Sequence, residues 1–208
     1  MTTPQAVPYP ARLQVDYPDR DLDRMSTALR IFYAIPIVAI VALISGPYQG
    51  EASSQGSITA GGILFFATLF MIVVRQKYPR WWFDWHLALT RFTTRVWSYL
   101  ALMNDEYPST DEEQTVHLEL DYPDVQNDLN RWLPFVKWIL AIPHFIVLFV
   151  LFIGSIFAII GAWFAIVFTG RYPRGIFDFV EGVMRWGLRV EAYSILLITD
   201  RYPPFSLN

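Results

Sequence analysis

The chain has 208 residues, of which 54% are hydrophobic and 17% charged, with a formal net charge of −3 and no cysteine. Soluble proteins average about 25% charged residues, so this composition is typical of an integral membrane protein. The absence of cysteine excludes disulfides, thiolate metal sites, cysteine nucleophiles and lipid-modified cysteines.

The predicted N-terminal tail, residues 1–11, is rich in proline and polar side chains. It lacks the basic and then apolar pattern of a cleaved signal peptide, so we expect none. Residues 13–16 alternate between apolar and polar side chains, which favours a short strand. The same alternation returns at residues 118–121.

Three apolar runs, at residues 31–45, 58–74 and 138–169, contain almost no ionisable side chain. The third run has about 32 residues, which is enough to cross a bilayer core of about 30 Å and return. Gly154 and Ser155 are the expected turn between its two halves. The runs therefore predict four transmembrane helices arranged as two hairpins.

The positive charges indicate how these hairpins are oriented. None of the 16 lysine and arginine residues lies in the segments that join the paired apolar runs. Because positive residues are retained on the cytoplasmic side, we expect cytoplasmic termini and outward-pointing hairpins. Arg30 and Lys137 would snorkel and so lengthen the first helix of each hairpin. The strictly apolar stretches have only about 15 to 17 residues, so hairpins that enter the bilayer without crossing it are an alternative.

An internal repeat organises the chain. The segments LQVDYPD and LELDYPD match, as do AIP with AIP and KYPR with RYPR, always in the same order. These matches predict a first repeat at residues 12–108, an acidic linker at 109–116 and a second repeat at 117–208. Since each repeat would cross the membrane twice, we expect parallel repeats related by a pseudo-twofold axis along the membrane normal. Under this axis, residues 13–16 and 118–121 would pair antiparallel into a small cytoplasmic ribbon.

Each repeat ends with a long amphipathic helix, expected in the second repeat from Gly175 to Thr199. Such a helix lies in the membrane interface or packs beneath the spanning helices. The predicted fold class is therefore all-α integral membrane. It has four transmembrane helices in two parallel two-helix repeats, each followed by an amphipathic interfacial helix, and a small two-stranded ribbon.

Aromatic and basic side chains on these helices are the candidate binding residues. The stretch KYPRWWFDW, residues 77–85, is expected to anchor a corner at the membrane boundary, because tyrosine and tryptophan settle at headgroup level. Each helix also carries two arginines spaced i, i+4, which repel each other unless a nearby anion neutralises their charge. That anion is an internal carboxylate such as Asp84 or Asp178, a phospholipid phosphate, or a partner protein. The candidate lipid- or partner-binding residues are Tyr78, Trp81, Trp82, Arg91, Arg95, Tyr172, Arg185 and Arg189.

His144 follows Pro143 in a predicted membrane helix and is the intramembrane polar candidate. It is either a functional residue or a hydrogen-bonded packing residue; a haem held by this histidine from two protomers is a further alternative. The other histidines, His86 and His117, fall in different predicted elements, so no metal cluster is expected.

The sequence carries no signature of catalysis. No charged residue lies deep in a predicted span, which argues against an active transporter. Nucleotide-binding loops are absent, as are Ser-His-Asp and His-Glu-x-x-His arrangements. We therefore expect no enzyme activity, no cofactor, no metal and no nucleic-acid partner.

The motifs DYPD, AIPHF, RYPRGIFDF and YPPF occur in this order. Through these motifs the chain resembles an uncharacterised bacterial membrane family, domain of unknown function 4389. The resemblance covers nearly the whole chain and is best in the second half. It implies a multi-helix protein of the bacterial inner membrane and supplies no activity or catalytic residues. The first half departs from the pattern, with Ile37 where the second half has His144 and Ser109 where it has Pro204.

Three functions follow from these observations. The first is a non-enzymatic inner-membrane scaffold or accessory subunit that binds phospholipid or a partner complex through its interfacial helices, alone or as a homo-oligomer. The alternative is an oligomeric channel or passive transporter lined by serine, threonine and histidine. The third is a membrane-embedded redox or lipid-modifying protein.

Overall fold

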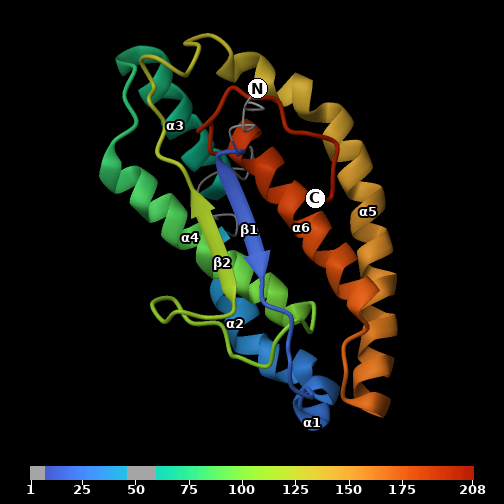
Figure 1. The fold of residues 1–208 in the computed structure, drawn as a ribbon. Helices are drawn as coiled ribbons and strands as arrows, with labels where there is room; N and C mark the ends of the chain where they lie inside the picture. Colours follow the sequence, from blue (N-terminus) through green and yellow to red (C-terminus); the bar gives the residue numbers. More distant parts are fainter. Residues whose placement is uncertain (1–7, 46–59) are drawn as a thin grey trace, which may run out of the picture.

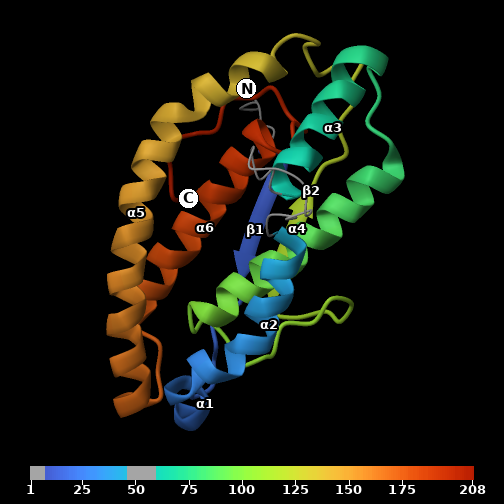
Figure 2. The ribbon, with the colours of Figure 1, turned by 180° about the vertical axis from the view of Figure 1, so that it is seen from behind.

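The computed structural model describes residues 8–45 and 60–208. In chain order the elements are β1 (Ala11–Val15), α1 (Arg24–Ala28), α2 (Arg30–Ser45), α3 (Ala60–Arg75), α4 (Arg80–Leu100), β2 (Val116–Leu120), α5 (Pro134–Thr169) and α6 (Arg174–Ser194). The strands form a ribbon, and α4 and α6 run in opposite directions behind it (Figure 1). Seen from behind, α2 and α3 lie on the side away from the ribbon, and α5 forms one flank (Figure 2).

The small two-stranded ribbon is present as predicted, but residues 13–15 lie opposite residues 116–118 rather than opposite 118–121. β1 and β2 are antiparallel, with Leu13 opposite Leu118 and Gln14 opposite His117. Alternate side chains of both strands are buried, as expected for a ribbon with one covered face. A two-stranded ribbon is marginal in water, and here α4 and α6 supply the apolar layer that covers it.

The predicted hairpin in the third apolar run is wrong, because α5 is one continuous helix of 36 residues. Gly154 and Ser155 lie inside it. A glycine inside a helix costs only about 1 kcal/mol relative to alanine, and the Ser155 hydroxyl donates to the Leu151 carbonyl at 2.9 Å. The space beside Gly154 is taken by Phe179 of α6, 3.7 Å from where a Cβ would lie. Helix α5 thus continues because α6 packs along it.

The predicted set of four transmembrane helices is also wrong. Among the described residues, α5 is the one helix long and apolar enough to cross a membrane. Helices α2 and α3 have 16 residues each, and their apolar segments, 30–42 and 65–75, are shorter still. A multi-pass arrangement with two hairpins is therefore not supported. The segment 46–59, which includes the predicted polar loop, lies outside the described residues.

Helices α4 and α6 are amphipathic, as predicted, but their apolar faces are largely used inside the protein. Each begins directly after a Tyr-Pro pair, since proline disfavours helical geometry in the residue before it. The buried face of α6 includes Phe177, Val180 and Leu188, which share a core with the inner face of the ribbon. Helix α6 ends at Ser194 rather than Thr199, and Leu197 adopts a left-handed φ of 57° just beyond it.

Several contacts recur at corresponding positions of the two predicted repeats. Both halves have a buried base paired with an acid, a left-handed leucine after the amphipathic helix, and a buried tyrosine that bonds across to the other half. The pairs are Arg30–Asp105 with Lys137–Asp200, Leu102 with Leu197, and Tyr78–Leu196 with Tyr172–Ala101. Corresponding residues therefore have corresponding surroundings.

The C-terminal segment crosses α6 so closely that only glycine fits beneath it. A Cβ at Gly182 would lie 2.8 Å from the Leu207 Cβ and 2.9 Å from its carbonyl oxygen. We expect Gly182→Ala to lower the free energy of unfolding by about 1–3 kcal/mol, because either the segment or the helix must shift. Thermal or chemical denaturation of the purified protein measures this change.

Gly187→Ala is the matched control, since it lies on the same helix and, apart from its chain neighbours and the nearby backbone of α6, no atom of the described residues lies within 4 Å of the place that its Cβ would take. It should be neutral or stabilise the protein by up to about 1 kcal/mol, as alanine favours helix. Equal stability of the two variants would mean that residues around Leu207 do not pack on α6 in solution.

Candidate functional site

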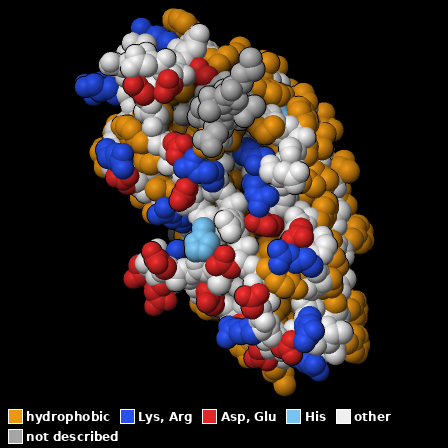
Figure 3. All heavy atoms as spheres, in the orientation of Figure 1, with side chains coloured by type: hydrophobic (Ala, Val, Ile, Leu, Met, Phe, Trp, Pro, Cys, Tyr) orange, Lys and Arg blue, Asp and Glu red, His pale blue; other side chains and the backbone are white. Residues whose placement is uncertain are grey.

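A continuous row of exposed apolar side chains runs along α5. Only 11% of its most apolar 18-residue stretch is buried, whereas the core helix of a soluble protein is mostly buried. Hydrophobic side chains line the α5 flank, and charged side chains lie on the ribbon face (Figure 3). The most exposed large side chains of the row are Ile139, Ile146, Phe149, Val150, Phe157 and Phe168, each at least 62% exposed. By length and composition, α5 can enter a membrane.

Apolar exposure continues on other helices. On α2, Ile31 is 79% and Phe32 is 68% exposed, and on α3, Phe70 is 60% exposed. Trp81 of α4 is 68% exposed and packs edge-on against Trp82. Tryptophan at such a surface suits the boundary between apolar and aqueous surroundings.

The two tyrosines predicted to bind lipid or a partner are not exposed at the surface. Tyr78 and Tyr172 are buried, and their hydroxyls donate to the Leu196 and Ala101 carbonyls at 3.1 and 3.2 Å. Trp82 is half-buried and donates its Nε1–H to the Thr68 hydroxyl at 2.9 Å. Of the four aromatic residues in the predicted binding set, Trp81 is therefore the exposed one, and Trp85 of the same stretch is exposed as well.

The four predicted arginines lie where the amphipathic helices meet the ribbon. Arg91 donates to the Leu118 carbonyl at 3.0 Å, and Arg185 donates to the Leu13 carbonyl at 2.9 Å. Each therefore holds one strand against its helix. Arg95 and Arg189 donate to carbonyls of the segments that follow their helices, at Ser109 and Ser206.

The carboxylates expected to neutralise these arginines pair elsewhere. Asp84 and Asp178 form exposed i, i+4 pairs with the arginines at the start of α4 and α6, at 3.2 and 3.1 Å. Arg185 pairs instead with Glu181, at 2.5 Å. The internal-pairing hypothesis thus holds for Arg185, with a different acid, while Arg91, Arg95 and Arg189 bond to backbone carbonyls.

His144 is fully buried in a packed aromatic cluster. Trp186 donates its Nε1–H to His144 Nδ1 at 3.1 Å, and the Phe205 ring stacks on the imidazole with centroids 3.9 Å apart. The Tyr202 ring also contacts it, and the Tyr202 hydroxyl donates to the Leu140 carbonyl. The cluster binds the C-terminal YPPF segment to α5, which favours the packing role for His144 over a role at an exposed site.

Sequence reasoning missed the two buried ion pairs. Arg30 and Lys137 were expected to snorkel, but they are 2% and 0% exposed and pair with Asp105 and Asp200, both at 2.7 Å. A signal was present, because base and acid occur at matching positions of both repeats. The partners are distant in sequence, so spacing alone did not reveal them.

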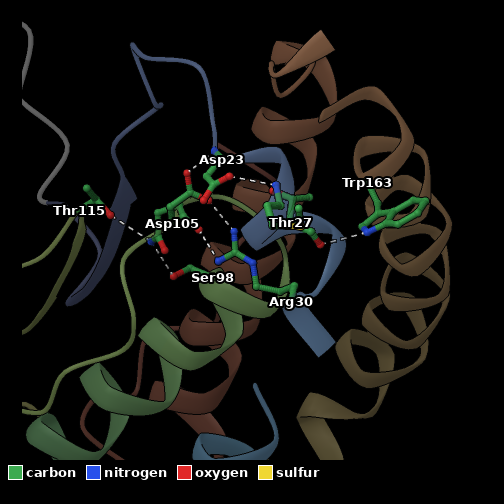
Figure 4. A network of polar contacts seen from close by, with 9 residues as sticks. Asp23, Thr27, Arg30, Ser98, Asp105, Thr115 and Trp163 are labelled. Atoms are coloured by element: carbon green, nitrogen blue, oxygen red, sulfur yellow. Dashed lines mark hydrogen bonds and ion pairs between the residues drawn. The ribbon is translucent and has the colours of Figure 1, made fainter. Parts of the chain in front are cut away.

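Around Arg30 the ion pair belongs to a wider network that joins four parts of the chain (Figure 4). Arg30 also donates to the Asn104 carbonyl at 2.8 Å, and Asp105 accepts from the backbone N–H of Asp23 at 2.8 Å. Trp163 of α5 donates to the Thr27 carbonyl at 3.1 Å. This network fixes the start of α2 to the segment after α4 and to α5.

The cavities of the protein differ in their linings. One of about 480 Å³ opens between α4, α5 and α6, lined by apolar residues such as Trp97, Phe152 and Met184, with Ser155 as its polar side chain. Across residues 8–45 and 60–208, no three His, Asp or Glu side chains are grouped so that they could hold a metal ion. The lining of the cavity between α4, α5 and α6 is suited to apolar contact.

Comparison with known families agrees with the resemblance seen in the motifs. Residues 131–206 match the family described as domain of unknown function (DUF4389). This stretch includes α5, α6 and the YPPF segment that packs on His144. No curated protein and no solved structure matches the chain.

Proposed function

We propose that this chain, a member over residues 131–206 of the domain of unknown function 4389 family, is a non-enzymatic membrane scaffold or accessory subunit. It attaches to a phospholipid bilayer through the exposed apolar face of α5, in a bacterial inner membrane with the ribbon on the cytoplasmic side. A homo-oligomer or a larger membrane complex would assemble on the remaining surface.

The observation that carries this proposal is the exposure of α5. Burying one large apolar side chain stabilises a protein by about 1.5–3 kcal/mol relative to water, and α5 leaves many of them uncovered. Lys137 is its one lysine or arginine, and that side chain is turned into the protein and paired. Contact with lipid would cover this face with no desolvation of an unpaired charge.

The length of α5 decides how it meets the bilayer. A helix of 36 residues is about 54 Å long, against about 30 Å for the hydrocarbon core. An upright α5 would leave apolar turns in water on both sides, and membrane helices seldom tilt beyond about 40°. We therefore place α5 obliquely or along the interface, with the polar ribbon facing water.

The channel alternative lacks comparable support. Its polar lining was to include His144, yet that side chain is fully buried against Trp186 and Phe205. The exposed side chains of α5 that neighbouring copies would share are apolar.

Two glutamates on the exposed face of α5 test the attachment. We expect Phe149→Glu with Phe157→Glu to reduce binding to phospholipid vesicles by more than a hundredfold, because each carboxylate in the apolar layer costs about 2–3 kcal/mol. Flotation with vesicles of phosphatidylcholine, after removal of detergent, measures bound and free protein.

The matched control adds the same charge to the ribbon side. Thr110→Glu with Gln126→Glu changes two exposed polar residues on either side of β2 and should leave flotation unchanged. If the α5 variant floats as well as the control, α5 does not contact lipid and the proposal fails.

A further inference from the structure

We propose that a pocket between β1 and α6 binds a phosphate-class anion through Arg185 and Arg189. The pocket, called here the arginine pocket, has a volume of about 370 Å³ and is lined by residues 8–9 and 11–14, the two arginines and Asn208. Figure 3 shows lysine and arginine side chains gathered beside β1 on this face. The site goes beyond membrane attachment, since it lies on the ribbon side and not on the exposed face of α5.

Arg189 is the reason to expect an anion. Arg189 is only 9% exposed, and its Nη1 donates to the Ser206 carbonyl at 3.3 Å. Its Nε is buried and has no hydrogen-bond partner in residues 8–45 and 60–208. Among the described residues no carboxylate pairs with it, and burial together with the neighbouring Arg185 lowers its pKa. A buried guanidinium is unfavourable unless a negative charge compensates it.

The carboxylates near the arginine pocket form ion pairs with other arginines than Arg189. Glu181 pairs with Arg185 at 2.5 Å. Glu119 and Asp121 pair with Arg12, which also lines the pocket, at 3.0 and 2.6 Å. Two of the three arginines in the pocket therefore have carboxylate partners, and Arg189 has none within the described part of the chain.

The corresponding arginine of the first half, Arg95, has similar contacts, since its Nε is also buried without a partner among the described residues. Arg95 donates to the Ser109 carbonyl, and the linker that follows carries Asp111, Glu112 and Glu113. The segment 206–208, whose Ser206 carbonyl accepts from Arg189, brings no acidic side chain. The two halves therefore differ in the charge near these arginines: three acids follow Ser109 in the sequence, whereas residues 206–208 carry none.

The geometry defines the class of ligand. The Arg189 guanidinium can donate charge-assisted hydrogen bonds to a tetrahedral oxyanion. Arg185, whose nitrogens already bond to the Leu13 and Leu207 carbonyls and to Glu181, adds positive charge one turn away. The volume is at the small end of ligand pockets and admits inorganic phosphate, a phosphomonoester or the phosphate of a lipid headgroup. All three share the chemistry that the arginines recognise.

Titration calorimetry of the purified full-length chain with inorganic phosphate, at constant ionic strength, tests the site. We expect saturable binding of one phosphate per chain and at least a tenfold loss of affinity in Arg189→Ala, because a charge-assisted contact is removed. Arg189→Lys should retain part of the affinity, since it keeps the charge but loses the fork of donors. Arg174→Ala, an exposed arginine on the same helix paired with Asp178, is the matched control and should bind like the unchanged protein.

A second arm identifies the source of the phosphate. Vesicles of phosphatidylcholine with and without phosphatidylglycerol are compared for the unchanged protein and for Arg189→Lys. A preference for phosphatidylglycerol that is weakened in Arg189→Lys assigns the site to a lipid headgroup, and saturable binding of phosphate alone assigns it to a free anion. If neither probe binds, or if Arg189→Ala that retains its thermal transition binds as well as Arg174→Ala, the proposal is overturned.

Discussion

Replacing Asp200 with alanine should destabilise the protein by about 3–5 kcal/mol, because Lys137 would then remain buried without its counter-ion. The Lys137 side chain is 0% exposed, and its Nζ lies 2.7 Å from the Asp200 carboxylate. Its other close contacts are the Thr199 carbonyl at 2.7 Å and the Tyr193 ring, and neither carries a negative charge. Thermal unfolding followed by circular dichroism should show a fall in midpoint of roughly 10 °C.

Two further variants separate the buried pair from charge in general. Asp178→Ala removes an acid from an exposed pair and should cost at most about 1 kcal/mol. The double variant Lys137→Met with Asp200→Leu should recover most of the loss, since an apolar pair can replace a buried ion pair. If Asp200→Ala and Asp178→Ala prove equally mild, Lys137 reaches water in solution and the packing of α5 on the C-terminal segment is looser than described.

Local patterns in the sequence were sufficient for the ribbon and for the starts of α4 and α6. The alternation in residues 13–16 and 118–121 shows which side chains face inward, but it leaves open which residues lie opposite one another, and the observed pairs are shifted from the predicted segments. Proline before Arg80 and Arg174 marks the first residue of each helix, because it restricts the backbone on both sides. These features depend on neighbours within a few residues.

Local sequence patterns could not decide whether the chain turns at Gly154. Glycine and serine occur in turns and also inside helices, and the apolar run is long enough for either arrangement. Tertiary contact decides the outcome, since Phe179, some 25 residues further along the chain, fills the space that the glycine leaves. Hydropathy alone gives no information about such a contact.

In the candidate site, too, local spacing was informative and long-range pairing was not. Sequence spacing identified Arg185 and Arg189 as a pair that requires a negative charge, and the structure shows that Glu181 serves the first of them. It did not show that Arg30 and Lys137 are buried, because their acids follow 75 and 63 residues later. Composition likewise suggested exposed anchors at Tyr78, whose hydroxyl instead bonds to α6's C-terminal segment.

His86 should make the protein less stable as the pH falls from about 6.5 to about 4. It is 6% exposed, lies against the rings of Trp82 and Trp85, and its Nε2 has no hydrogen-bond partner among the described residues. Burial disfavours the charged imidazolium and lowers the pKa of His86 to about 4. Between these pH values His86 binds a proton in the unfolded chain but stays neutral in the folded protein. The resulting loss in the free energy of unfolding reaches about 3 kcal/mol at pH 4.

Glu191 acts in the opposite direction. Burial raises the pKa of its carboxyl group to about 7, so its contribution is full below the unfolded value and is lost as the pH rises through 7. Between pH 4.5 and 6.5 the two groups oppose each other, and the unchanged protein should show only a shallow dependence from this pair. His86→Phe should remove the opposing effect of His86. The free energy of unfolding of this variant should therefore rise more steeply on acidification than that of the unchanged protein.

Denaturant titrations at pH 7, 5.5 and 4.5 on the unchanged protein, His86→Phe and His86→Phe with Glu191→Gln measure these slopes. Other carboxylates contribute equally to all three proteins, so the differences between them isolate the two groups. Glu191→Gln added to His86→Phe should reduce the slope again. If His86→Phe has the same pH dependence as the unchanged protein, the imidazole titrates freely in the fold, and the tryptophan cluster at the start of α4 is open to water.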